Sequence, residues 1–374
     1  MKKKMILISL TIFILIQFML HTNIAINAVM EGIKLWFYNV LPSLFPFMIF
    51  SSILFQLDTA YFLQRFFNGF MIKFFNVSGS GTLPTFMGYI SGYPLGSKLV
   101  CDLKKEGYIT LKEGYKLLAL SSATGPAFII GIVSLQMFGN KFIIPILLLA
   151  NYLGAIANEL FLKRVYKEKI SLNKLIKKPY KNFSNILNDA IMTSITSSLK
   201  ICGYIVFFNL IIRYLDSFGL FSSMTNTISS LISITHISEQ LIKGTLYGFF
   251  EITLGIYTIS QCNDPLILKV ALTSLLIAWS GFSIHLQTNS FLMETDLRFS
   301  KYLFGKLTQG IFSLLISIAA FLIIKPPVLA VFRDHTMFKF VQSYYLYSYC
   351  FIIIVIITYI ILKILMNQGI IKRL

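Results

Sequence analysis

The chain has 374 residues, of which 56% are apolar and 15% aromatic, and its formal net charge is +18. Few soluble domains of this size can bury so much apolar surface, so the composition argues against a soluble protein and indicates a polytopic membrane protein. The basic residues cluster in short connections between apolar runs, as the positive-inside rule and anionic headgroups require, and no nucleic-acid-binding motif accompanies them. We therefore expect a lipid bilayer as a partner and no nucleic acid.

Apolar runs of about 20 residues, the length that a helix needs to cross hydrocarbon, recur along the whole chain. They lie near 5–27, 33–57, 117–138, 142–162, 200–215, 240–260, 265–289, 300–324 and 347–366. The first follows a basic start without a small-residue cleavage site, so we expect an uncleaved helix. Runs near 60–75, 83–101 and 183–199 are shorter, more polar or interrupted, which is typical of interfacial or re-entrant elements.

The most basic connection, KRVYKEKISLNKLIKKPYKN, divides the chain near its middle and is predicted to be cytoplasmic. We expect an N-terminal transmembrane half at 1–162, this basic loop at 163–182, and a second transmembrane half at 183–324. A polar loop and a C-terminal transmembrane helix follow at 325–374. Basic residues at both ends of the chain place both termini in the cytoplasm.

The first interruption is GYISGYPLGSKL, from Gly88 to Leu99. Pro94 lacks a backbone N–H and ends or kinks a helix, and the glycines on either side permit unusual backbone angles. Freed backbone groups are costly in lipid, so this segment should face protein or a wet cavity. The helix that resumes after it would direct amide groups at an anion, with Lys98 in its first turn. The alternative is a structural kink.

The second interruption is SSATGPAFIIG, where hydroxyl side chains precede Gly125 and Pro126. It predicts a half-helix tip, with Ser122, Thr124 and backbone groups facing a cavity. Alternatively, these hydroxyls bond back to helix carbonyls, which is a common structural use.

In the second half, GFFEITLG places Glu251 inside an apolar run, and SGFSIHLQTNS places His285 after a Ser-Gly break. An intramembrane carboxylate usually faces a cavity or a partner, although a position near the headgroups is an equal alternative. His285 either titrates near neutral pH or serves as a structural hydrogen-bonding group. Lys200, beside an apolar run, either pairs with a carboxylate or reaches toward the interface.

The scattered histidines and cysteines have no metal-binding or redox spacing, so we expect neither a metal nor another cofactor. No catalytic motif is present, and we expect the protein not to be an enzyme.

The two halves share an order of interruptions, and this is a sequence indicator of a transporter binding site at the interface of repeats. The fold class predicted is all-α, a polytopic membrane protein of two pseudo-repeated halves, read as inverted repeats, each with a broken or re-entrant helical hairpin. The candidate substrate-binding residues all lie at or beside the interruptions. They are Ser91, Gly92, Pro94, Gly96, Ser97, Lys98, Thr124, Gly125, Pro126, Lys200, Glu251, Thr253, Gly255, Ser280, Gly281, His285 and Gln287.

Five segments, LPSLFPFMIFSSIL, GYISGYPLGSKL, EGYITLKEGYKLLALSSATGPAFIIG, FEITLG and SGFSIHLQ, together resemble the sporulation integral membrane protein YlbJ (SpoVV) family, which carries a nucleoside-recognition gate domain. The resemblance runs from about Leu41 to Lys306. Ser97 and Thr124 depart mildly from the family pattern, in which Ala and Ser stand at these positions.

The resemblance implies a role in endospore formation: an integral membrane protein of the outer forespore membrane that passes dipicolinic acid toward the forespore. A homo-oligomer or a complex with other sporulation membrane proteins is compatible with this role. Three alternatives remain open: a transporter of nucleosides, a transporter of other small anions, and a membrane scaffold that transports nothing.

Overall fold

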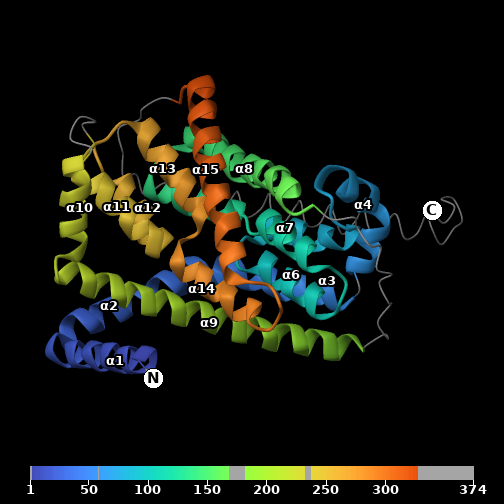
Figure 1. Ribbon diagram of the computed structural model, residues 1–374, viewed down its shortest axis with the longest axis horizontal. Helices are drawn as coiled ribbons and strands as arrows, with labels where there is room; N and C mark the ends of the chain where they lie inside the picture. Colours follow the sequence, from blue (N-terminus) through green and yellow to red (C-terminus); the bar gives the residue numbers. More distant parts are fainter. Residues whose placement is uncertain (1, 58, 168–181, 232–236, 327–374) are drawn as a thin grey trace, which may run out of the picture. The chain divides into compact units, whose positions relative to one another are not determined.

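The structure, a computed structural model, describes residues 2–57, 59–167, 182–231 and 237–326 (Figure 1). All these residues belong to one compact unit, Met1–Leu329. Every regular element in the described residues is helical, which confirms the all-α class. The predicted run at 347–366 and most of the basic loop lie outside the described residues.

The helices of the first half are α1 (Lys2–Leu20), α2 (Thr22–Leu35), α3 (Leu41–Gln56), α4 (Thr59–Phe75), α5 (Thr82–Ser91), α6 (Leu95–Lys105), α7 (Leu111–Ser121), the π-helix η3 (Phe128–Met137) and α8 (Ile144–Val165). Those of the second half are α9 (Phe183–Ser217), α10 (Leu220–Leu231), α11 (Glu239–Phe250), α12 (Ile252–Ser260), α13 (Leu266–Trp279), α14 (Gly281–Leu292) and α15 (Phe299–Ile324). Two 3₁₀ turns (Gly79–Gly81 and Lys141–Ile143) and a π-helix (Trp36–Val40) complete the described elements.

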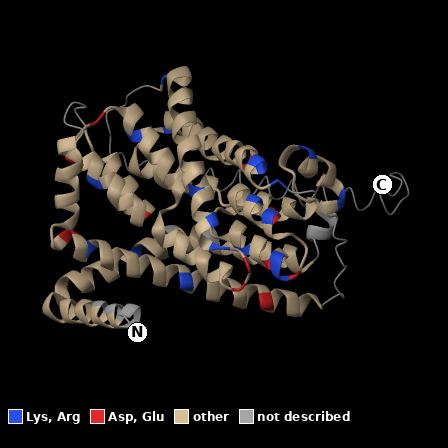
Figure 2. Ribbon diagram, viewed as in Figure 1, with Lys and Arg blue, Asp and Glu red and all other residues tan. Residues whose placement is uncertain are grey.

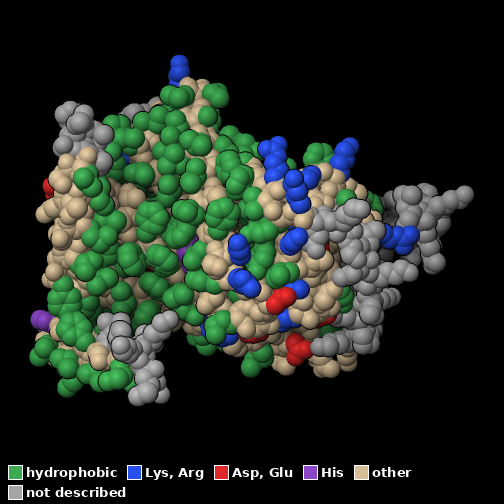
Figure 3. Space-filling view, in the orientation of Figure 1, with side chains coloured by type: hydrophobic (Ala, Val, Ile, Leu, Met, Phe, Trp, Pro, Cys, Tyr) green, Lys and Arg blue, Asp and Glu red, His purple; other side chains and the backbone are tan. Residues whose placement is uncertain are grey.

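Four helical segments of the described chain are long and apolar enough to cross a membrane, at Lys141–Val165, Phe183–Ser217, Leu266–Leu292 and Phe299–Ile324. A fifth is added if the bent pair Thr11–Leu20 and Thr22–Tyr38 counts as one span. Figure 3 shows a broad hydrophobic surface on one face, with the visible Lys and Arg side chains gathered mostly to one side of the view. This distribution is that of a polytopic membrane protein.

The N-terminal run differs from the single helix predicted at 5–27. The chain bends by 101° between Leu20 and Thr22. The Thr22 hydroxyl donates to the carbonyl oxygens of Phe18 and Met19, at 3.1 Å each, and so bonds locally at the bend.

The run at 183–199, predicted to be interfacial or re-entrant, instead forms one continuous helix with the next run, α9. Its polar residues do not interrupt it because Ser194 and Thr196 donate to carbonyl oxygens four residues earlier. The run at 240–260 is not one helix but two, α11 and α12, which meet at Glu251.

Each half contains a pair of short helices packed closely against each other as a hairpin. In the first half, α5 and α6 cross at Gly88 and Gly96, and a methyl group on Gly88 would lie 1.9 Å from the carbonyl oxygen of Ser121. In the second half, α11 and α12 cross at Gly248 and Gly255, where a methyl group on Gly255 would lie 2.2 Å from the Gly248 Cα. Glycine is required at these crossings because any side chain would separate the backbones.

Candidate functional site

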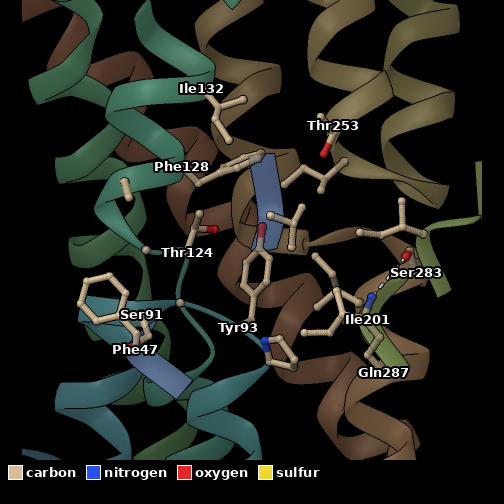
Figure 4. Close-up of a pocket in the computed structure, with 18 of the residues that line it drawn as sticks. Phe47, Ser91, Tyr93, Thr124, Phe128, Ile132, Ile201, Thr253, Ser283 and Gln287 are labelled. Carbon is tan, nitrogen blue, oxygen red and sulfur yellow. Dashed lines mark hydrogen bonds between the residues drawn. The ribbon is translucent and has the colours of Figure 1, made fainter. Parts of the chain in front are cut away.

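The tips of both hairpins and both broken helices, α7–η3 and α13–α14, border one cavity (Figure 4). The cavity volume is about 80 Å³, whereas a cavity of roughly 10–15 Å³ is enough to hold one water. The cavity therefore has room for several waters. The residues that line it are Val40, Phe47, Ile90, Ser91, Gly92, Tyr93, Pro94, Thr124, Gly125, Ala127, Phe128, Ile132, Ile201, Ile205, Glu251, Ile252, Thr253, Ser283, Ile284 and Gln287.

The first hairpin reaches the cavity through Gly92, Tyr93 and Pro94. Gly92 has φ +85°, and a methyl group on it would lie 2.5 Å from the Gly125 amide nitrogen. The tip of the first hairpin thus touches the break in α7–η3 directly, and only glycine fits there. Tyr93 lines the cavity, with its ring between the other labelled residues in Figure 4, and its peptide bond to Pro94 is cis.

The break after α7 is held by two neighbours from other helices. Asn151 on α8 donates to the Thr124 carbonyl at 3.0 Å and accepts from the Thr124 amide at 3.3 Å. The Thr124 hydroxyl donates to the carbonyl of Ile277 on α13, at 3.1 Å. The backbone groups of Thr124 are therefore satisfied by protein, as a lipid environment requires, and the break in one half is bonded to the broken helix of the other.

Glu251 lies at the tip of the second hairpin and is 5% exposed. Its carboxylate accepts from the amides of Thr253 at 3.0 Å and Leu254 at 2.7 Å, so it caps the N-terminus of α12. This differs from the expectation that the half-helices present bare amides to a guest: at α12, a side chain of the chain itself occupies that position.

Two of the residues that line the cavity have a buried polar atom without a hydrogen-bond partner: the Ser91 hydroxyl and the Gln287 side-chain oxygen. The Gln287 amide nitrogen makes a long 3.5 Å contact with the Ser283 hydroxyl (Figure 4). Buried polar atoms without partners are rare in folded proteins, and in a cavity they are natural contacts for a polar guest.

Lys306 on α15 is the functional candidate that the sequence reading missed. It is 1% exposed, and its ammonium donates to the Ser122 carbonyl at 2.6 Å and to the Gln309 side-chain oxygen at 2.8 Å. It also lies 5.7 Å from the centre of the Tyr93 ring, which lines the cavity. These partners are all neutral. The rule that singled out Glu251, an ionisable residue within an apolar run, would have identified Lys306 in the run at 300–324.

Eight of the predicted site residues line the cavity: Ser91, Gly92, Pro94, Thr124, Gly125, Glu251, Thr253 and Gln287. The other nine do not, and their surroundings explain why.

Gly96 and Gly255 lie at the helix crossings, where they pack against backbone. Ser97 bonds to the Ser122 hydroxyl. Pro126 directly follows the break, whereas Ser280 and Gly281 form the break between α13 and α14 with φ angles of +83° and +78°.

His285 is fully buried, with its Nδ1 3.2 Å from the Tyr302 hydroxyl and its ring against Trp279. This is the structural alternative considered for His285.

Lys98 and Lys200 were the predicted counter-charges for an anion, but neither lines the cavity. Lys200 is exposed, and both act electrostatically on Glu294 in the loop before α15. In that loop, a hydrogen bond from Lys105 lowers the pKa of Glu294, and Lys104 pairs with Asp296 at 3.4 Å. Figure 2 shows basic and acidic residues close together in this part of the molecule. Lys104 and Lys105 therefore join α6 to the loop before α15.

No group of three or more potential metal ligands occurs among the described residues. The polar groups at the cavity are hydroxyls, an amide and the Glu251 carboxylate that caps α12, next to aromatic and aliphatic side chains. Such a site can bind a small molecule with an apolar body and polar edges.

No protein-family model matches the chain. The chain is 28% identical over 328 residues to the sporulation integral membrane protein YlbJ of Bacillus subtilis (strain 168), with 83% of this chain and 80% of the relative covered. This similarity confirms the resemblance indicated by the motifs.

A similar solved structure is that of CNTnw in an inward-facing substrate-bound state. Its TM-score is 0.51 at 13% identity, and the match covers 82% of this chain and 85% of that chain. A likeness at this identity concerns the fold, and it agrees with a polytopic helical protein. The two comparisons together support a polytopic helical integral membrane protein.

Proposed function

From its similarity to the sporulation integral membrane protein YlbJ, we propose that this chain transports dipicolinic acid across the outer forespore membrane. The cavity between the four interruptions would hold the substrate, and movement of the hairpins relative to the broken helices would expose it to either side. No covalent intermediate is involved. Both termini would lie in the cytoplasm.

The observation that carries this proposal is the charge around the cavity. Dipicolinate is a planar aromatic dianion at neutral pH. The Glu251 carboxylate is already stabilised by two amides of α12, whereas the Lys306 ammonium has only neutral partners. Lys306 does not itself line the cavity but lies behind Tyr93, which does, and an anion bound beside Tyr93 would supply the counter-charge that this buried ammonium lacks.

The shape and polarity of the lining also favour a small aromatic guest. Phe47, Tyr93 and Phe128 offer ring faces, while the Ser91 hydroxyl and the Gln287 amide offer hydrogen-bonding groups at the cavity wall. The aromatic ring of dipicolinate can stack on these side-chain rings while its two carboxylates accept hydrogen bonds from the polar groups.

The test is uptake of labelled dipicolinate by liposomes that contain the purified protein, compared with empty liposomes. We expect saturable uptake that unlabelled dipicolinate suppresses and that a nucleoside such as uridine does not. Suppression by uridine alone would favour the nucleoside alternative, and the absence of any dipicolinate uptake would contradict the proposal.

The scaffold alternative is separated by neutralising the lysines of the basic loop at 163–182. A scaffold that recruits partners through this loop should then fail in sporulation. A transporter in which the cavity is intact should still take up dipicolinate in liposomes.

A further inference from the structure

Another buried carboxylate, Glu159, lies on α8 and does not line the cavity. Glu159 is 0% exposed within a helix long enough to span the membrane. Neither of its carboxylate oxygens has a hydrogen-bond partner. Its neighbour Asn158, by contrast, is fixed by bonds to the Gly305 carbonyl at 2.8 Å and the Thr308 hydroxyl at 2.6 Å.

The charged groups that act on Glu159 make no hydrogen bond to its carboxylate. Lys116 on α7 and Lys163 on α8 act on it electrostatically, but hydrogen bonds from their ammonium groups reach backbone carbonyls at the end of α4. Tyr89 on α5 also interacts electrostatically with Glu159, and the Tyr89 hydroxyl is itself buried without a hydrogen-bond partner. On α15, the neutral residues Gly305 and Thr308 bond to the adjacent Asn158.

An ionised carboxylate that is buried without hydrogen bonds costs several kcal/mol, and more in a membrane interior. Protonation removes that cost, and no cluster of oxygen, nitrogen or sulfur ligands for a metal ion occurs in the described parts of the chain. We propose that Glu159 is a proton-binding site, and that its protonation is coupled to transport. The coupling, but not the proton binding, rests on the proposed function.

The connection between Glu159 and the cavity runs along α8 itself. Asn151, which holds the backbone of Thr124 at the cavity wall, lies eight residues before Glu159 on the same helix. That spacing corresponds to about 12 Å along an α-helix. A displacement of the break by a bound substrate would therefore act on α8 and change the surroundings of Glu159.

Proton binding is tested without any substrate, by infrared spectroscopy of the purified protein in lipid as a function of pH. We expect a band from a protonated carboxylic acid at neutral pH that Glu159→Gln diminishes. The matched control is Glu113→Gln, because Glu113 is also buried, at 3% exposed, but accepts hydrogen bonds from the Ser78 and Thr110 amides. A protonated-acid band that Glu159→Gln leaves unchanged would overturn the proton site.

Coupling is tested by dipicolinate uptake into liposomes with and without a pH gradient. The wild type should be stimulated by the gradient, whereas Glu159→Gln should lose the stimulation and keep exchange of dipicolinate across the membrane. Equal stimulation in both proteins would overturn the coupling. If neither protein transports dipicolinate while the infrared difference persists, the proposed substrate fails and the proton site stands.

Where Glu159→Gln reduces the amount of folded protein, Glu159→Asp provides the second variant, because it keeps a titratable carboxyl group. It should retain the protonated-acid band. Loss of the band in the folded Asp variant would count against the assignment.

Discussion

The two hairpins that border the cavity cross in the same way but end differently at their tips. Each brings two helices together at glycines, Gly88 with Gly96 and Gly248 with Gly255. The second tip carries Glu251, which caps the N-terminus of α12, whereas no side chain caps the start of α6 after Pro94. The glycine crossings that both hairpins share therefore position the hairpin tips, whereas the residues at each tip determine the charge that the tip presents to the cavity.

The same asymmetry extends to the helices behind the tips. Lys306 of α15 contacts Ser122 at the break after α7, and its ammonium lies over the ring of Tyr93. The first-half side of the cavity therefore has an ammonium nearby, and the second-half side has a carboxylate whose charge is met by backbone amides. An anion should therefore be held mainly on the first-half side of the cavity, next to the Lys306 ammonium.

The largest expected effect comes from breaking the shared packing. Gly255→Ala places a methyl group 2.2 Å from the Gly248 Cα, so the two helices of the second hairpin must separate. Overpacking costs about 1–3 kcal/mol or more. Thermal unfolding in detergent should show a clear loss of stability. The control is Gly203→Ala in α9, where no atom lies within 4 Å of the added methyl group; a comparable loss there would contradict the packing argument.

A smaller effect is expected from the polar wall of the cavity. Gln287→Leu keeps the approximate size of the side chain but removes an amide that lines the cavity. Loss of a hydrogen bond to a buried polar group costs about 1–3 kcal/mol, so dipicolinate binding should weaken about five-fold or more. The control is Asn289→Leu, which also replaces a side-chain amide by Leu on the same helix but outside the cavity lining. Calorimetric affinities that fall equally in both variants would show that the cavity is not the binding site.

The tip of the second hairpin offers a test in the opposite direction. Glu251→Gln removes the charge from the cavity while leaving one oxygen to cap α12. The weakened cap should cost less than about 1 kcal/mol of stability. Dipicolinate binding should be unchanged or tighter, because a like charge has been removed. A marked loss of affinity in this variant would mean that Glu251, and not the first-half side, holds the substrate.

The smallest effect concerns the connection of α6 to the loop before α15. The hydrogen bond from Lys105 lowers the pKa of Glu294 in the folded protein, so this pair stabilises the fold above the ordinary Glu pKa. The contribution is lost as the pH falls through the lowered pKa. Because Glu294 is exposed, Glu294→Gln should change the stability at neutral pH only slightly and reduce its decrease in acid. If the unfolding free energy of Glu294→Gln falls in acid as steeply as that of the wild type, the stabilising role of the Lys105–Glu294 pair is contradicted.

The interruptions could be predicted from the sequence because their signals are local. Proline and glycine at Pro94 and Gly125 disturb a helix wherever they occur, and a carboxylate such as Glu251 is conspicuous in an apolar run. The predicted placement of those residues at one cavity therefore agrees with the structure for eight of the candidates.

The other contacts at the site depend on tertiary packing, which cannot be inferred from local sequence patterns. Asn151 and Lys306 reach the break after α7 from helices that are distant in the sequence. Lys98 lies next to the first break in sequence, yet it belongs to the charged region around Glu294 and not to the cavity. Proximity in sequence identified the interrupted segments, but not the direction in which each side chain points.

The central claim is that Lys306 provides the charge that holds an anionic substrate. It is tested most directly by measuring dipicolinate binding to purified Lys306→Met and Lys301→Met, two identical changes on α15, the first buried beside Tyr93 and the second exposed. Lys306→Met should weaken binding about ten-fold or more, because a charged hydrogen-bonding group contributes roughly 1.5–3 kcal/mol, whereas Lys301→Met should bind like the wild type. Equal affinity in all three proteins, with Lys306→Met still folded, would contradict the account.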